Sequence, residues 1–363
     1  MNKNQKICFC NTSVTWGGGE KWHNENAQML HVEGWDVHCI VKSKSEFEKK
    51  LSHHDILKYT SVNFSNFSVL NPLSYIVALL RLKKIKPDVI IFCLPRDVKI
   101  WGLAAKILGI RHRIYRRGSA IPIRNTLTNK LIFKHIVTHI IANSQETKRT
   151  ILQNNPTLFP EHKISIIYNG ITTENFSEVK KEINEKCIMI GTAGRIVPQK
   201  NHAVLLDIAE KLLLSTSQFK ICIAGEGILK LQLEEEITKR NLQNHVELIG
   251  FIHPIEKFLH TIDIFVLPSI WEGFGYVIAE AMYCSKPVIA FNISSNPELI
   301  EHNKTGFLIP PYSIQEFSDK LLFFINNPQE IHKMGAMGKE IALSRFTFQI
   351  SFSNFKNFLK SLD

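Results

Sequence analysis

Short apolar runs alternate with amphipathic stretches along the whole chain, a pattern typical of the strands and crossover helices of parallel sheets. Five such runs lie in each half of the chain. The predicted strands are residues 6–10, 37–41, 89–93, 113–116, 139–142, 187–193, 219–224, 246–249, 264–267 and 287–290. The pattern therefore predicts the α/β class, with two Rossmann-like β/α/β domains that face each other across a ligand-binding cleft.

A polar segment divides the two predicted domains. Residues 171–186 carry a run of polar and charged positions, which is the composition of a linker. A chain of 363 residues also has the length of two compact domains. We expect an N-terminal domain over residues 1–170, a C-terminal domain over residues 187–345, and a helix over residues 346–363 that packs back toward the first domain.

The composition is that of a folded soluble protein, with 44% hydrophobic and 21% charged residues. No apolar run reaches the roughly 18–20 residues of a membrane span, and the first run is too short for the core of a signal peptide. The seven cysteines include no Cys-x-x-Cys motif, which favours reduced, buried thiols over a zinc site. We therefore expect a cytoplasmic protein.

The positive charge of the chain is concentrated in its first half. Residues 1–170 hold 25 Lys and Arg against 11 Asp and Glu, whereas residues 171–363 hold 19 against 22. Such a basic half attracts nucleic acid, anionic lipid head groups or phosphorylated sugar polymers, or is only a solvated basic face. Nucleic acid is not expected as a partner, because no helix-turn-helix, zinc motif or set of interleaved stacking aromatics is present.

Three glycines, residues 17–19, follow the first predicted strand and precede a predicted helix over residues 20–31. At such a turn, backbone amides approach a ligand without interference from side chains. The segment is not a P-loop, because no Gly-Lys-Ser or Gly-Lys-Thr follows, and Trp22 stands where the last glycine of Gly-x-Gly-x-x-Gly would be. It either closes on a ligand or forms a tight structural turn.

Arg195 and Lys200 follow Gly194 at the end of a predicted strand. A guanidinium holds two oxygens with a planar fork and an ammonium adds a mobile point charge, so the two residues suit a diphosphate. The alternative is two exposed surface cations.

Glu272 and Glu280 lie on either side of a glycine-containing turn into a predicted helix over residues 276–284. The amides at the start of that helix suit a phosphate or sugar hydroxyls, and carboxylates accept hydrogen bonds from hydroxyls. The alternative is a solvated loop acid and an acid on the helix surface. Because no Asp-x-Asp motif occurs, we expect no metal, with Arg195, Lys200 and the helix start neutralising a diphosphate. We also expect no cofactor.

Taken together, these segments resemble family 4 (group 1) of the retaining, nucleotide-sugar-dependent glycosyltransferases, which have the two-Rossmann-domain architecture called GT-B. The resemblance covers nearly the whole chain, and its specific part is the Glu272 to Glu280 motif with Gly194, Arg195 and Lys200. It makes the N-terminal domain the acceptor side and the C-terminal domain the donor side.

The resemblance also implies roles for individual residues. Arg195 and Lys200 would bind the donor diphosphate, Glu280 the ribose, and Glu272 the transferred sugar. Further donor contacts would come from backbone groups, namely those of Gly18, Gly19, Gly194, Phe251, Ile252, Gly273, Phe274, Gly275, Tyr276 and Val277.

Three positions depart from the family pattern. Arg116 and Arg117 stand near the place of a common histidine, and we interpret them as acceptor or phosphate contacts. Residues 294–296 read Ser-Ser-Asn where the family often has two glycines, and Asn201 follows Lys200 where glycine is usual. Sugar contacts in the loop over residues 294–296 are therefore expected to differ.

The resemblance implies a metal-independent, retaining hexosyltransferase. It would move a sugar from a nucleotide diphosphate sugar to an anionic or lipid-linked glycan of cell-surface polysaccharide or lipopolysaccharide synthesis. Residues 79–86 and 123–134, which mix apolar and basic positions, would contact the inner membrane face or are ordinary crossover helices. The alternatives are a nucleotide-sugar epimerase on the same fold and a basic membrane- or nucleic-acid-binding module without catalysis.

Overall fold

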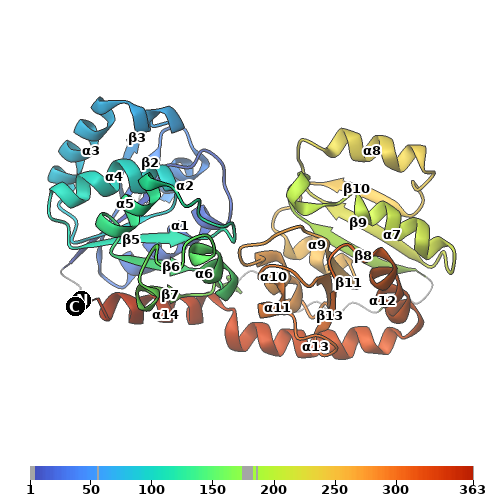
Figure 1. Cartoon of the computed structure of the whole chain (residues 1–363). Coiled ribbons are helices and arrows are strands. Elements are labelled where there is room, and N and C mark those ends of the chain that lie inside the picture. Colours follow the sequence, from blue (N-terminus) through green and yellow to red (C-terminus); the bar gives the residue numbers. More distant parts are fainter. Residues whose placement is uncertain (1–4, 55–56, 174–182, 185–186, 363) are drawn as a thin grey trace. The chain divides into compact units, whose positions relative to one another are not determined.

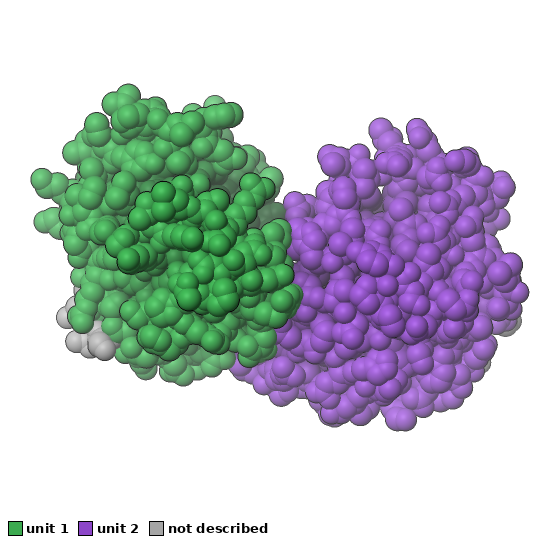
Figure 2. Space-filling model, in the orientation of Figure 1, with its two compact units in different colours: residues 1–168, 351–363 green, residues 169–350 purple. Residues whose placement is uncertain are grey.

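The chain folds into two compact units, each built on one parallel sheet (Figure 1). The computed structural model describes residues 5–54, 57–173, 183–184 and 187–362. The first unit contains residues 1–168 and 351–363, and the second contains residues 169–350 (Figure 2). Most of the predicted linker over residues 171–186 lies outside the described residues.

The sheet of the first unit has seven parallel strands in the order β3-β2-β1-β4-β5-β6-β7. Its strands are β1 (Lys6–Asn11), β2 (Asp36–Lys42), β3 (Lys58–Val62), β4 (Val89–Phe92), β5 (His112–Arg117), β6 (His139–Ala142) and β7 (Ile164–Ile166). The helices between them are α1 (Gly18–Val32), α2 (Glu46–His54), α3 (Pro72–Ile85), α4 (Pro95–Ile107), α5 (Leu127–His135) and α6 (Gln145–Leu152), with short 3₁₀ turns η1 (Asn66–Leu70) and η2 (Glu161–Lys163).

The sheet of the second unit has six parallel strands in the order β10-β9-β8-β11-β12-β13. Its strands are β8 (Ile188–Ala193), β9 (Phe219–Ala224), β10 (Val246–Gly250), β11 (Ile264–Leu267), β12 (Val288–Phe291) and β13 (Gly306–Ile309). Its helices are η3 (Pro198–Lys200), α7 (Val204–Leu213), α8 (Lys230–Lys239), α9 (Glu256–Thr261), α10 (Tyr276–Tyr283), α11 (Asn296–Leu299), α12 (Ile314–Asn326) and α13 (Pro328–Arg345).

The two parallel sheets confirm the predicted α/β class with two Rossmann-like domains. The inner strands β4, β11 and β12 are buried at every position, as expected for strands covered on both faces by helices. Sequence patterns missed β3, β7 and β13, all of which lie at sheet edges. β3 is mostly polar and β7 has only three residues, so their apolar signal is weak, whereas β13 is apolar and as long as β11 and was overlooked.

The last helix, α14 (Phe348–Lys360), lies mostly in the first unit although it follows the second in sequence (Figure 1). The ring of Phe355 contacts Trp22 of α1 at a centroid distance of 5.0 Å. Lys356 Nζ and Glu33 Oε1 form an ion pair at 2.7 Å, and Ser351 Oγ donates a hydrogen bond to the backbone oxygen of Tyr168. These contacts attach α14 to α1 and to Tyr168, where the first stretch of the first unit ends.

No helix in the described part of the chain is long and apolar enough to cross a lipid bilayer.

Helix α13 packs closely on α10 in the second unit, and two buried glycines of α13, Gly335 and Gly338, lie where the two helices pack. A Cβ on Gly335 would overlap the backbone oxygen of Ser285, which follows α10. A Cβ on Gly338 would instead lie in ordinary contact with Met282, 3.6 Å from its Cβ. The two glycines of α13 therefore have different structural roles.

We expect opposite effects from alanine at these two positions. Gly335→Ala should lower the free energy of unfolding by about 1–3 kcal/mol, because the overlap with a backbone atom forces α13 away from α10. Gly338→Ala should raise it by up to about 1 kcal/mol, because alanine favours helix without a clash. Urea denaturation followed by circular dichroism measures both, and a change of the same sign in the two variants would contradict this packing.

Candidate functional site

The loops that follow β8 and β11 meet where the strand order of the second sheet reverses. Ligands of open parallel sheets bind at such a switch point, outside the carboxyl ends of the strands. Gln199 joins the two loops, because its Nε2 donates to the backbone oxygen of Trp271 at 2.9 Å. Its backbone oxygen also accepts from the amide of Ile270 at 2.8 Å. The two loops therefore form one connected surface.

Lys200 and Glu272, one from each of these loops, form a buried ion pair. Lys200 Nζ lies 2.6 Å from Glu272 Oε1, and the side chains are 13% and 9% exposed. The backbone oxygen of Glu272 accepts hydrogen bonds from Ser294 Oγ at 2.6 Å and Ser295 Oγ at 3.3 Å. The sequence treats Lys200 and Glu272 as members of separate motifs, whereas the fold brings them into direct contact.

Glycines at the ends of β8 and β9 allow the backbone to fold tightly beneath this pair. Gly194 has a φ of 154°, and a Cβ there would lie 3.1 Å from Lys200 Cε. Gly225 has a φ of 152°, and its Cβ would overlap the backbone oxygen of Gly194. Glycine is required at both positions, because other residues rarely adopt these φ values and the space is filled.

Two predicted donor contacts are exposed near the same edge of the sheet. Arg195 follows Gly194 in sequence, and its side chain is exposed. The guanidinium of Arg195 forms no hydrogen bond or ion pair with any described residue. Phe251 follows β10 and is 73% exposed, with its ring stacked on His253 at 6.3 Å between centroids. The neighbouring Ile252 is half-buried. Arg195 therefore offers an available positive charge, and Phe251 an available aromatic face.

The loop over residues 273–275 leads into α10 through Gly275, which adopts a left-handed conformation with a φ of 79°. Phe274 anchors this loop, because it is buried and its ring lies 5.6 Å from those of both Tyr276 and Phe346. Gly275 has no side chain to cap α10, whose N-terminal end favours negative charge. Tyr276 and Val277, in the first turn, are half-buried.

Glu280 lies in the second turn of α10 and is half-buried. Its charge acts on Cys284 one turn further along, where burial is the main cause that raises the pKa of the thiol to about 12. Glu280 is thus on the helix and Glu272 in the preceding loop, as the sequence pattern predicts.

In the first unit, the helix after β1 begins at Gly18, so Gly18 and Gly19 lie in its first turn and not before it as predicted. A Cβ on Gly19 would lie 3.0 Å from Cys93 Sγ, in the loop after β4. β1 and β4 are the strands between which the order of this sheet reverses. Gly19 therefore lets α1 start close against the neighbouring loop.

Arg116 and Arg117, at the end of β5, point to opposite faces of the sheet, as consecutive strand residues do. Arg116 is 2% exposed, and its guanidinium lies 5.2 Å from the ring of Trp22. Arg117 donates to the backbone oxygen of Ile121 and to Tyr115 Oη, and it lines a cavity of about 190 Å³ with Lys99 and Arg124. Arg117 is thus placed at a cavity, whereas Arg116 is buried against Trp22.

The described residues contain no group of three His, Cys, Asp or Glu side chains that could hold a metal ion.

Family models match both units. The model of the group 1 glycosyl transferases matches residues 173–341, and the model of glycosyltransferase family 4 matches residues 16–175. The chain belongs to the family 4, group 1 glycosyltransferases. The first match contains Arg195, Lys200, Glu272 and Glu280, and the second contains the glycines of α1 together with Arg116 and Arg117. These matches confirm the family predicted from the motifs.

The curated relatives of this glycosyltransferase include two bacterial enzymes whose names state the sugar that they transfer. A poly(ribitol-phosphate) α-N-acetylglucosaminyltransferase of Staphylococcus aureus is 28% identical over 63% of this chain, and the aligned part is 47% of that relative's length. The chain thus spans about half of that relative. A UDP-Gal:α-D-GlcNAc-diphosphoundecaprenol α-1,3-galactosyltransferase of Escherichia coli is 26% identical over 87% of each chain.

Solved structures share the fold of this glycosyltransferase. The crystal structure of Anabaena HepE in complex with UDP and glucose superposes with a TM-score of 0.83 at 22% identity, covering 99% of this chain and 100% of HepE. This likeness supports the assignment of the GT-B fold.

Three features of the glycosyltransferase site were missed from the sequence. Gln199 joins the two loops, and Ser294 and Ser295 hold the backbone of Glu272 at the position where the family often has two glycines. His202 is buried, and burial together with the positive charge of Lys200 lowers its pKa to about 4. The imidazole is therefore neutral at pH 7, and Lys200 supplies the buried positive charge. The sequence does show two serines in place of the usual glycines and a histidine two positions after Lys200. It does not show what these side chains contact, because those contacts depend on the fold.

Proposed function

We propose that this protein is a retaining, metal-independent glycosyltransferase that moves a sugar from a nucleotide diphosphate sugar to an anionic or lipid-linked glycan. The buried ion pair between Lys200 and Glu272, beside the exposed Arg195, is the observation that carries the proposal. The E. coli relative supports it, because by its name that enzyme uses UDP-Gal and a diphosphoundecaprenol-linked sugar. The product would belong to cell-surface polysaccharide or lipopolysaccharide synthesis.

The chemical task is to stabilise a leaving diphosphate. In the transfer, the bond between the anomeric carbon and the phosphate oxygen breaks, and the electron pair leaves with the nucleoside diphosphate. The acceptor hydroxyl forms the new bond to the anomeric carbon, and in a retaining reaction it enters from the side on which the diphosphate departs. Its proton then passes to the departing phosphate oxygen. Arg195, Lys200 and the N-terminal end of α10 supply positive potential for the growing charge.

The ion pair prepares Lys200 for this task. An unpaired ammonium that is only 13% exposed would be costly, and Glu272 offsets that cost before a donor binds. A bound diphosphate would then share the ammonium with Glu272, since lysine has three N–H donors. Glu272 is in turn free to accept hydrogen bonds from sugar hydroxyls with its second carboxylate oxygen. The pair thus links the diphosphate contact to the sugar contact.

Removal of either cation tests the diphosphate assignment. Arg195→Ala and Lys200→Ala should each lower kcat/KM at least tenfold, because a charge-assisted contact to the transition state is worth about 1.5–3 kcal/mol. Nucleoside diphosphate release in the presence of acceptor measures the rate, and Lys333→Ala, which removes an exposed lysine of α13, is the matched control. Turnover like that of the parent in both variants would rule out the assignment. Epimerisation of donor alone would support the epimerase instead.

Chelation and product analysis test the metal-independent, retaining mechanism. We expect the same rate with and without EDTA, because Arg195, Lys200 and the start of α10 take the place of a divalent ion. The product should keep the anomeric configuration of the donor, as read from proton coupling constants. An activity that EDTA abolishes and Mg²⁺ or Mn²⁺ restores, or a product of inverted configuration, would refute the respective part of the mechanism.

The first unit also presents an apolar surface on α3. Residues one turn apart along this helix are exposed, with Leu73 at 64%, Ile76 at 51% and Leu80 at 63%, whereas the stripe that includes Ala78 and Leu82 is buried. The preceding turn η1 adds Phe67 and Leu70, each 82% exposed. We call the exposed residues 67, 70, 73, 76 and 80 the α3 surface.

The charges beside the α3 surface favour a lipid partner. Helix α3 contains no acidic residue, and Arg81, Lys83 and Lys84 are exposed near its C-terminal end. A helix with an exposed apolar stripe and adjoining cations lies well in the interface of an anionic membrane. Of the two segments predicted to contact a membrane, residues 79–86 form the basic end of this helix. We propose that the α3 surface holds the protein at the inner membrane face.

Vesicle binding tests the membrane contact. The double variant Leu73→Glu with Leu80→Glu should bind vesicles of phosphatidylcholine and phosphatidylglycerol at least tenfold more weakly in a sedimentation assay, because two charges would enter the apolar interface. The control is Val32→Glu with Leu214→Glu, which alters side chains that are 72% and 84% exposed elsewhere. Equal binding by the two double variants, or equal binding of the parent to neutral vesicles, would contradict the proposal.

A further inference from the structure

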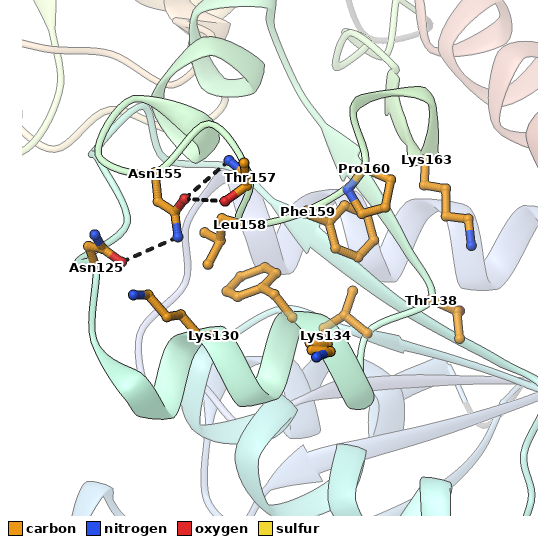
Figure 3. Close-up of a pocket in the computed structure, with 12 residues that line it drawn as sticks. Asn125, Lys130, Lys134, Thr138, Asn155, Thr157, Leu158, Phe159, Pro160 and Lys163 are labelled. Atoms are coloured by element: carbon orange, nitrogen blue, oxygen red, sulfur yellow. Dashed lines mark hydrogen bonds between the residues drawn. The ribbon is translucent and has the colours of Figure 1, made fainter.

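A groove of about 590 Å³ runs along α5 on the surface of the first unit (Figure 3). Helix α5 forms one wall, and the segment between α6 and β7 forms the other. We call it the α5 groove, and its lining residues are Asn125, Lys130, Phe133, Lys134, Val137, Thr138, Asn155, Thr157, Leu158, Phe159, Pro160 and Lys163. None of the residues assigned above to donor binding lines it.

The floor of the α5 groove is apolar and partly aromatic. Phe133, Leu158 and Phe159 line the groove and are otherwise buried, at 5%, 5% and 4% exposed. The rings of Phe133 and Phe159 meet edge to face, with centroids 6.1 Å apart and an interplanar angle of 74°. This packing fixes the floor, which therefore offers a rigid apolar face to the C–H side of a ligand ring.

Three lysines surround this floor. Lys130 and Lys134 lie one turn apart on α5, about 6 Å along its axis. Lys163 lies across the groove near Thr138, as Figure 3 shows. All three are exposed, and none forms an ion pair with a described residue. No acidic residue lines the groove, and Glu161 beside Lys163 in sequence pairs with Lys148 at 3.0 Å.

Amide and hydroxyl groups form a fixed polar rim at one end. Asn155 Nδ2 donates to Asn125 Oδ1 at 3.3 Å. Asn155 Oδ1 accepts from the amide of Thr157 at 3.1 Å and from Thr157 Oγ1 at 2.9 Å. Figure 3 shows these bonds beside the side chain of Lys130. The bonds hold the Asn and Thr side chains in place, where their remaining donors and acceptors face hydroxyls of a ligand.

We propose that the α5 groove binds an anionic saccharide chain. The apolar floor suits the C–H face of a sugar ring, the Asn and Thr rim suits its hydroxyls, and the three lysines suit carboxylate or phosphate groups along the chain. A lipid surface does not fit, because the groove is concave and its apolar floor is bordered by polar and charged side chains. That the bound saccharide is the acceptor of the reaction rests on the proposed function, whereas the binding itself rests only on the groove.

The binding test compares an acidic with a neutral sugar. Isothermal titration of the full chain with pentagalacturonic acid should give measurable affinity that falls as salt is raised, and maltopentaose should bind at least tenfold more weakly. The triple variant Lys130→Ala, Lys134→Ala, Lys163→Ala should bind the acidic sugar at least tenfold more weakly than the parent. The matched control is Lys58→Ala, Lys106→Ala, Lys360→Ala, which removes three exposed lysines of the first unit outside the groove. It should bind like the parent.

Further variants and ligands distinguish failure of the groove proposal from failure of the proposed function. Lys200→Ala should keep the affinity for pentagalacturonic acid, so loss of turnover in that variant leaves the groove proposal standing. An arginine triple variant at positions 130, 134 and 163 should restore binding. Equal weakening by the two alanine triples, or equal affinity for acidic and neutral sugars, would overturn the proposal. Equally tight, competing binding of a single-stranded RNA oligonucleotide would also overturn it, because the groove would then recognise charge without sugar.

Discussion

The ion pair between Lys200 and Glu272 is the contact on which the proposed donor site depends. Its two members come from loops 72 residues apart in sequence, and they meet only because β8 and β11 are neighbours in the sheet. Two mostly buried charges are stable there only while they remain paired. The pair therefore fixes the ends of both loops relative to each other, and with them the positions of Arg195 and the start of α10.

The surroundings of the pair show how the fold makes room for it. Glycine at 194 and 225 brings the ends of β8 and β9 together, and Lys200 lies over Gly194. The switch point of the first unit follows the same plan, because Thr12 after β1 bonds through its hydroxyl to Asp97 of α4 at 2.5 Å. Burial raises the pKa of Asp97 to about 6. In both units, a polar contact joins the segments that follow the two strands at the reversal.

Particular residues show how much of this was predictable from the sequence. The inner strands were predicted within about one residue, because burial on both faces leaves continuous apolar runs such as residues 264–267. Lys200 and Glu272 were each identified from loop composition, but their contact depends on strand order, which a local pattern does not encode. Ser294 and Ser295 were noticed as a departure, yet their hydrogen bonds to Glu272 come from a third loop. Gly19 was interpreted as a possible ligand contact, which stays a prediction, and the fold adds a packing constraint from Cys93 that the sequence does not reveal.

The division of charge between the two halves of the chain fits the proposal that the second half binds the donor and the first half binds the acceptor. The second half has nearly balanced charge, and its site places one buried ammonium and one exposed guanidinium at a single edge of the sheet. A few fixed cations suit a small ligand with a compact diphosphate, because the positions of the cations around the phosphates matter more for binding than the total charge of the unit. The first half carries its excess as many exposed lysines and arginines, including the three of the α5 groove. Cations spread over a surface suit an extended anionic ligand. Each single charge contact is weak, but the contacts along a long ligand add up to a large attraction. A donor-binding unit and an acceptor-binding unit would therefore differ in charge distribution even though both are built on the same parallel fold.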